Sequence, residues 1–180
     1  IKIIGEAYAK LSKWARSDHV PTFDDYIQVG IASAGMRYLA MLSFIALEDC
    51  DEIQTNKWFE SKPKILEAIC VLLRLENDIG GYEVKMKRGD VANGVNCYIK
   101  QHGVTKEVAV REIKKMIKDN YKIVMEEFLT TKGVPRPILL RCLNMVRLIK
   151  LYYTEGDEFT NPHGKLKDLI KSLFFHSLPL

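Results

Sequence analysis

The sequence has few cysteines, and none of them lie close together. Its four cysteines, Cys50, Cys70, Cys97 and Cys142, include no CxxC pair, and three of them fall inside apolar helical patterns. A zinc site or a disulfide framework uses paired or closely spaced cysteines, so this spacing favours neither. It indicates reduced core residues of an intracellular protein.

Long apolar runs and clusters of basic residues are also missing. The most apolar stretch, residues 65–75, is interrupted by Glu67 and Arg74 and is too short to cross a bilayer. The 27 basic and 23 acidic residues are scattered along the chain and leave a net charge of +4. Because a nucleic-acid surface needs clustered basic residues, we expect neither a nucleic-acid partner nor stable membrane insertion.

The chain lacks an initiator methionine, a signal-peptide pattern, strand-like alternation, internal repeats and low-complexity segments. We therefore expect a start that is processed or cut. With 180 residues, 47% of them hydrophobic, the chain is long enough for one domain or part of one.

Apolar residues instead recur every three or four positions, which predicts an all-α helical bundle. Thr22 and Thr105 are suitable N-caps, the first before an apolar run from Tyr26 to Leu47 and the second before a stripe from Val108 to Phe128. The glycines in residues 30–35 predict an interruption of the first helix. Further helices are expected from Pro63 to about Lys85 and after Pro137.

Polar residues at the end of an apolar helix are the most informative feature. Arg74, Asn77 and Asp78 directly follow the apolar residues 69–73. Burial requires partners for such groups. A structural interpretation is an interhelical ion pair between Arg74 and Asp78, with Asn77 capping a neighbouring helix.

A functional interpretation comes from a resemblance that extends over the whole chain. Residues 74–90 and 97–104 resemble the second metal-motif region of plant class I terpene synthases. Residues 13–26, 62–66 and 157–160 and the C-terminal residues 165–180 are also similar to this family, in the branch of sesquiterpene and casbene-like diterpene synthases. The resemblance implies the C-terminal portion of the class I terpenoid synthase fold.

The family motif [N/D]DxxSxxxE places three oxygen ligands at i, i+4 and i+8, on one face of a helix. The resemblance implies that they bind Mg²⁺, or Mn²⁺, which grips a prenyl diphosphate together with ions held by a DDxxD motif. Asn77 and Asp78 match the first two positions and are the expected metal ligands. Gly81 and Lys85 stand where Ser or Thr and Glu are expected. Glu83 lies about 240° from Asn77 around the helix and does not replace the missing glutamate.

Two explanations of this departure remain open. Lys85, two turns beyond Asn77, places an ammonium near the diphosphate, with Arg74 as a second cation, and supplies charge that a metal ion gives elsewhere. Alternatively the site is degenerate, and the protein is a vestigial, non-catalytic helical protein.

The resemblance also implies the remaining site residues. Ser33, Ala34 and Gly35 match the broken-helix segment whose carbonyl groups face the substrate, and Tyr38 matches a cavity position. Tyr152 and Asp157 match catalytic positions near the lid, with Asp157 as a candidate partner for the Tyr152 hydroxyl. Lys87 and Arg88 are read either as diphosphate contacts or as a solvated helix end.

We therefore expect a magnesium-dependent carbon–oxygen lyase acting on a geranyl, farnesyl or geranylgeranyl diphosphate, in the cytoplasm or a plastid, as a monomer or weak homodimer. The rivals are the non-catalytic protein and, less favoured, a chain-elongating prenyltransferase, which uses a second aspartate-rich motif. A DDxxD motif is absent from residues 1–180. By the resemblance it lies upstream, together with an N-terminal domain, so residues 1–180 are about the last third of a synthase and are inactive alone.

Overall fold

The computed structural model describes residues 2–45, 47 and 52–175, and within these ranges all regular structure is helical. The predicted all-α class is confirmed. Cys70, Cys97 and Cys142 are free and buried, as expected, whereas Cys50 lies outside the described residues. The helices are α1 (Lys2–Arg16), α2 (Phe23–Ala34), α3 (Met36–Ile45), α4 (Glu52–Glu60), α5 (Lys64–Gly80), α6 (Tyr82–Lys87), α7 (Gly94–His102), α8 (Lys106–Thr130), α9 (Arg136–Tyr153) and α10 (Gly164–Phe175).

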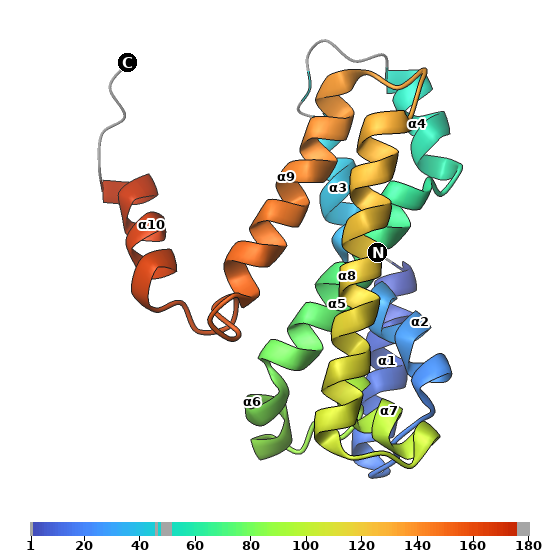
Figure 1. Cartoon of the computed structure of the whole chain (residues 1–180), viewed down its shortest axis with the longest axis vertical. Helices are drawn as coiled ribbons and strands as arrows, with labels where there is room; N and C mark the ends of the chain where they lie inside the picture. The colour runs from blue at the N-terminus through green and yellow to red at the C-terminus, as the bar shows by residue number, and fades with distance from the viewer. Residues whose placement is uncertain (1, 46, 48–51, 176–180) are drawn as a thin grey trace.

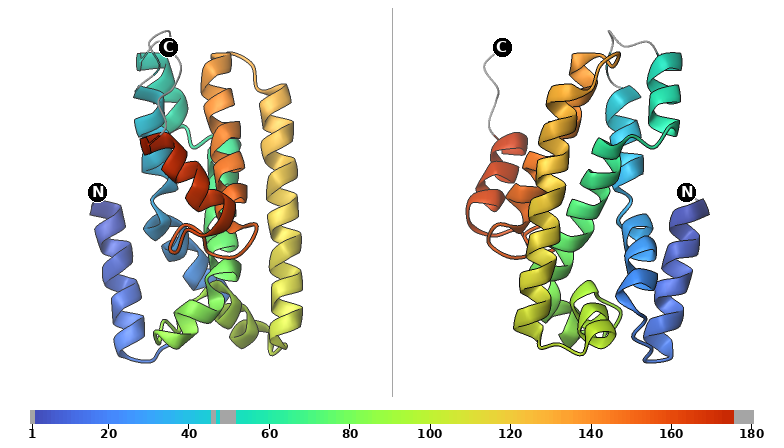
Figure 2. Two further views of the ribbon diagram at one scale, coloured as in Figure 1. Left: turned by 90° about the vertical axis from the view of Figure 1, so that its left-hand side faces the viewer. Right: turned by 45° about the vertical axis from the view of Figure 1, so that its right-hand side comes forward.

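Helix α5 is the centre of the molecule. It is apolar around most of its circumference, and Ile65, Leu66, Ile69, Leu72 and Leu75 are at most 1% exposed. A helix that is apolar on nearly every side is stable only where other helices cover it. Helix α8 packs along α5, while α9, α2 and α3 cover its other sides (Figure 1; Figure 2).

The predicted N-caps are confirmed. The Thr22 hydroxyl accepts a hydrogen bond from the Asp25 amide at 3.1 Å, and Thr105 accepts one from the Val108 amide at 3.4 Å. Each bond satisfies an amide that has no partner within its helix. The sequence therefore fixes where α2 and α8 begin.

The predicted interruption lies at Gly35, between α2 and α3. Gly35 adopts φ 69° and ψ 6°, and its amide donates to the carbonyl of Ala32. This left-handed conformation is readily accessible only to glycine and ends α2. Helix α3 starts at the next residue in a new direction.

The expected helix from Pro63 to Lys85 is shorter than predicted. Pro63 is the N-cap of α5, but α5 ends at Gly80, and α6 follows after Gly81. Two consecutive glycines weaken the helix at this point. The break at Gly81 comes three residues after Asp78, so Lys85 belongs to a separate helix.

Helix α10 lies to one side of the other helices and follows an irregular loop after α9 (Figure 1). Several of its large apolar side chains, among them Leu173 and Phe174, are more than 70% exposed. Among the described helices, none combines the length and the apolar composition needed to cross a membrane.

Candidate active site

A cavity of about 970 Å³ lies between α1, α2, α3, α5, α6 with the segment after it, α9 and the loop after α9. Its walls are largely apolar, with Leu11, Met36 and Leu73 among the lining residues. The polar residues Arg74, Asn77 and Lys85 meet at one part of the wall. Concave, mostly apolar pockets with a few converging polar groups are typical of small-molecule sites.

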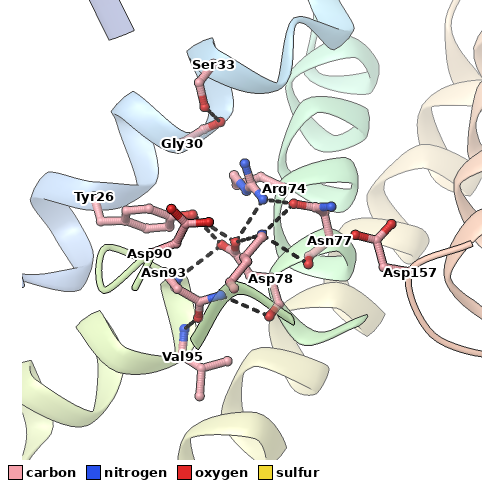
Figure 3. A network of polar contacts seen from close by, with 12 residues as sticks. Tyr26, Gly30, Ser33, Arg74, Asn77, Asp78, Asp90, Asn93, Val95 and Asp157 are labelled. Atoms are coloured by element: carbon pink, nitrogen blue, oxygen red, sulfur yellow. Dashed lines mark hydrogen bonds and ion pairs between the residues drawn. The ribbon is translucent and has the colours of Figure 1, made fainter. Parts of the chain in front are cut away.

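Asp78 is fully buried beneath this polar wall, and its two carboxylate oxygens are both engaged. Arg74 Nη2 lies 2.8 Å and Lys85 Nζ 3.0 Å from Oδ1. The Tyr26 hydroxyl, from α2, lies 2.8 Å from Oδ2, and the Gly94 amide donates to the same oxygen at 3.2 Å. Figure 3 shows Asp78 between Arg74, Asn77, Tyr26 and Asn93. Two cations and two hydrogen bonds offset the cost of burying one charge.

Asn77 lies at the cavity and is contacted by the same two cations. Its Oδ1 accepts hydrogen bonds from Arg74 and, at 2.6 Å, from Lys85 Nζ. Its amide nitrogen donates to the Tyr153 hydroxyl at 3.0 Å. Asn77 therefore orients two positive groups and one hydroxyl around its own side chain.

The structural interpretation of the sequence is correct in one respect and wrong in two. Arg74 and Asp78 do form an ion pair, but both belong to α5, at i and i+4, so the pair is not interhelical. The Asn77 side chain also does not cap a neighbouring helix, because its contacts are Arg74, Lys85 and Tyr153. The prediction that these polar groups have partners is confirmed.

Burial and charge shift several pKa values in this cluster. Burial lowers the pKa of Lys85, opposed by the nearby Asp78 carboxylate. Burial also acts to lower the pKa of Arg74, but the pKa is raised because Asp78, Tyr26 and Tyr153 together outweigh burial. Burial, followed by the charge of Asp78, raises the pKa of Tyr26 well above its ordinary value. For both cations beside Asp78, burial disfavours the charged form and the carboxylate favours it.

The structure places Tyr153, rather than Tyr152, against Asn77. The Tyr152 ring packs edge-on against Phe159, with ring centroids 5.5 Å apart, and within the described residues its hydroxyl has no hydrogen bond. Asp157 instead accepts hydrogen bonds from the Thr160 amide at 3.0 Å and hydroxyl at 2.7 Å. The expected bond between Tyr152 and Asp157 is therefore not formed, although both residues line the cavity.

The other predicted site residues divide into two groups. Ser33 and Ala34 line the cavity, and the Ser33 hydroxyl donates back to the carbonyl of Gly30 at 2.9 Å. Gly35, Tyr38 and Lys87 are not among the lining residues.

Helix geometry explains the second group. A Cβ at Gly35 would face Ile4 of α1, at 3.6 Å. Tyr38 and Lys87 each come two residues after a lining residue, Met36 and Lys85, and so lie about 200° around their helices. Arg88, rather than Lys87, contributes to the wall of the cavity.

The residues of the second motif do not fit a magnesium ion well. Mg²⁺ needs accessible oxygen ligands in near-octahedral geometry. Asp78 has no solvent contact, and two cations already lie against Asn77 Oδ1. Gly81 offers no side-chain ligand, and Lys85 places an ammonium where the motif has a carboxylate. The expected metal role of Asn77 and Asp78 stays a prediction.

Sequence reasoning missed the contribution of Tyr26, Gly94 and Tyr153 to this site. Gly94 is required by space, because a Cβ there would lie 2.6 Å from Asp78 Oδ2. Tyr26 and Gly94 lie 52 and 16 residues from Asp78 in sequence. A tyrosine in an otherwise apolar helical pattern was the available signal, since a buried hydroxyl needs a partner.

Comparison with known proteins identifies the family. Residues 1–123 match the terpene synthase family, metal binding domain. Terpenoid synthase 22 of Arabidopsis thaliana is 71% identical over 180 residues, which is 100% of this chain and 30% of that protein. Germacrene C/D synthase of Valeriana officinalis is 39% identical and aligns with 96% of this chain and 31% of its own length. The chain thus belongs to the terpene synthase family, and it spans about 30% of the curated relatives it matches.

Solved structures show the same fold. Isoprene synthase from grey poplar, in complex with three Mg²⁺ ions and dimethylallyl-S-thiolodiphosphate, has a TM-score of 0.82 at 22% identity and covers 98% of this chain and 34% of its own. Limonene synthase with 2-fluorolinalyl diphosphate also has a TM-score of 0.82, at 17% identity, with 98% of this chain and 33% of its own covered. The resemblance inferred from the sequence is confirmed.

Proposed function

We propose that this chain is the C-terminal part of the catalytic domain of a terpene synthase that ionises a prenyl diphosphate. The carbon–oxygen bond to the diphosphate breaks, the electron pair leaves with the diphosphate, and a carbocation remains in the cavity. Loss of a proton or addition of water then gives the terpene product. A geranyl, farnesyl or geranylgeranyl chain is the substrate class.

One observation carries this proposal. Arg74 and Lys85 meet at one part of the wall of an otherwise largely apolar cavity of about 970 Å³. Positive groups at one part of the wall suit a diphosphate, and apolar walls exclude water from a carbocation. The Tyr152 and Phe159 rings, which also line the cavity, offer faces that stabilise positive charge. Two solved structures of the same fold contain prenyl diphosphate analogues, dimethylallyl-S-thiolodiphosphate in isoprene synthase and 2-fluorolinalyl diphosphate in limonene synthase, which supports a prenyl diphosphate as the substrate without fixing its chain length.

Divalent metal ions, Mg²⁺ or Mn²⁺, supply charge neutralisation for the leaving diphosphate in this proposal. Because Asn77 and Asp78 fit such an ion poorly, we place its main ligands outside residues 1–180, on an upstream aspartate-rich motif. Residues of this chain bind and orient the diphosphate, and Asp157 holds the loop after α9 at the cavity through Thr160.

The competing function is a non-catalytic helical protein of the same fold. Gly81 and Lys85, which depart from the metal motif, are the observation that favours it. The retained cavity and the ordered polar cluster at its wall favour the enzyme.

The test uses the full-length protein, at the length of its curated relatives, with each of the three prenyl diphosphates across a magnesium titration. We expect magnesium-dependent release of diphosphate together with a hydrocarbon or alcohol product. A folded protein that releases none contradicts the proposal. Activity only in a Gly81→Ser, Lys85→Glu double variant would show that the fold is intact but the site has decayed.

A further inference from the structure

We propose that the ammonium of Lys85 occupies the position at Asn77 that the family motif gives to a divalent cation. On this side of the cavity, the diphosphate then binds a lysine side chain in place of a metal ion. The inference rests on the proposed function and assigns to Lys85 the charge-compensating role on this side of the cavity. It also means that Asn77 positions Lys85 and does not bind metal.

The surroundings of Lys85 Nζ are those of a bound cation. Three oxygen atoms surround it: Asn77 Oδ1 at 2.6 Å, Asp78 Oδ1 at 3.0 Å and the Asn77 carbonyl at 3.3 Å. An ammonium has three protons to donate, and the contact at 3.3 Å is the weakest of the three. A diphosphate oxygen at the cavity replaces this contact most easily.

The same contacts exclude a divalent ion from Asn77. An amide oxygen has two lone pairs, and here Arg74 and Lys85 lie against it. The Lys85 side chain is only 15% exposed and its ammonium is paired with Asp78. A metal ion that displaced Lys85 would separate this ammonium from the carboxylate, which is unfavourable in a buried site. Asp78, with no exposed surface, offers no alternative ligand.

The two departures from the motif fit each other. A Cβ at position 81 would lie 3.3 Å from Lys85 Cε and 3.1 Å from Asp157 Oδ2. Glycine at this position therefore spares the Lys85 side chain a tight contact where it returns to Asn77. Gly81 and Lys85 are sterically compatible with each other in this arrangement.

The balance of charge at the cavity wall also supports this inference. Among the described residues, four cations line the cavity, Arg74, Lys85, Arg88 and Arg141, against the two carboxylates Asp90 and Asp157. Asp78, to which Arg74 and Lys85 are paired, lies beneath the wall, so the positive charges still exceed the negative ones by one. An excess of positive charge at a partly buried wall attracts a diphosphate without a metal ion at that point.

The first experiment counts bound Mn²⁺ by electron paramagnetic resonance in the full-length protein with inorganic pyrophosphate. We expect the unmodified protein to bind one Mn²⁺ fewer than the Gly81→Ser, Lys85→Glu double variant, which restores the motif. Pyrophosphate binding with equal Mn²⁺ counts in both proteins overturns the inference but leaves the proposed function standing. Failure of the unmodified protein to bind pyrophosphate overturns both.

The second experiment measures pyrophosphate binding without metal and needs no double variant. Lys85→Gln removes the charge but keeps a polar side chain, and we expect about tenfold weaker binding, in line with a lost charge-assisted hydrogen bond. Lys106→Gln is the matched control, because Lys106 is 43% exposed and pairs with Glu83 outside the cavity. Equal binding by Lys85→Gln and Lys106→Gln overturns the inference.

Discussion

Asp78 is the residue around which the polar side chains of the site are arranged. Its carboxylate contacts Arg74 on its own helix, Lys85 on α6, Tyr26 on α2 and the amide of Gly94 on α7. A buried carboxylate is stable only while these partners remain. Through these contacts, Asp78 connects α2, α6 and α7 to α5 at the cavity wall.

Tyr26→Phe tests this dependence. Removing the hydroxyl takes away the shorter of the two hydrogen bonds to the buried Asp78 Oδ2 and leaves only the Gly94 amide on that oxygen, so we expect the free energy of unfolding of the full-length protein to fall by about 1–3 kcal/mol. Denaturant unfolding measures the loss. Tyr38→Phe is the control, because the Tyr38 hydroxyl has no hydrogen bond within the described residues, and it should change stability by less than about 0.5 kcal/mol. An equal effect of the two variants would contradict the network.

At the scale of helices, two glycine positions determine the shape of the cavity. The turn at Gly35 separates α2 from α3, so that Ser33 and Ala34 from one helix and Met36 from the next all reach the cavity. The bend at Gly81 separates α5 from α6 and brings Lys85 back to Asn77.

Gly35→Ala and Gly5→Ala form a matched pair for this idea. Gly35 has a φ of 69°, so alanine there should cost about 1–2 kcal/mol of stability. Gly5 lies within α1 on its exposed face, and an added Cβ there has no atom within 4 Å. Alanine at this position should therefore increase stability by about 0.5–1 kcal/mol. Thermal unfolding of both variants checks the opposite signs. Equal signs would show that the break does not depend on the glycine conformation.

At the scale of the whole molecule, the buried polar cluster makes the stability of the fold depend on pH. Burial raises the pKa of Tyr153 to about 12; its hydrogen bond with Asn77 acts to lower the pKa by less, and the charge of Asp157 adds to the rise. The unfolded tyrosine ionises near pH 10, before the folded one. The unfolded state then binds fewer protons than the folded state, and stability decreases as the pH rises.

We therefore expect alkaline destabilisation that is reduced when Tyr153 is replaced by phenylalanine. Between pH 10 and pH 12, the unmodified protein should lose about 1 kcal/mol per pH unit relative to Tyr153→Phe. Below pH 9 the difference between the two proteins should be constant. Denaturant unfolding at each pH gives both values. A difference that stays constant up to pH 12 would mean that Tyr153 is not buried as described.

Local sequence determined the helical class, the caps at Thr22 and Thr105, the break near Gly35 and the set of polar residues after the apolar part of α5. These features depend on residues within a few positions of one another, through periodicity, capping and backbone freedom. The departure of Gly81 and Lys85 from the metal motif was visible in the same way.

Tertiary structure alone decided which groups meet. Tyr26 and Gly94 reach Asp78 from other helices, and Tyr153 rather than Tyr152 reaches Asn77. The bend after Gly80 also decided that Lys85 returns to the cavity while Lys87 does not line it. One residue is about 100° of helix rotation, so a side chain's neighbours depend on how the helices pack, and the sequence pattern does not fix that packing.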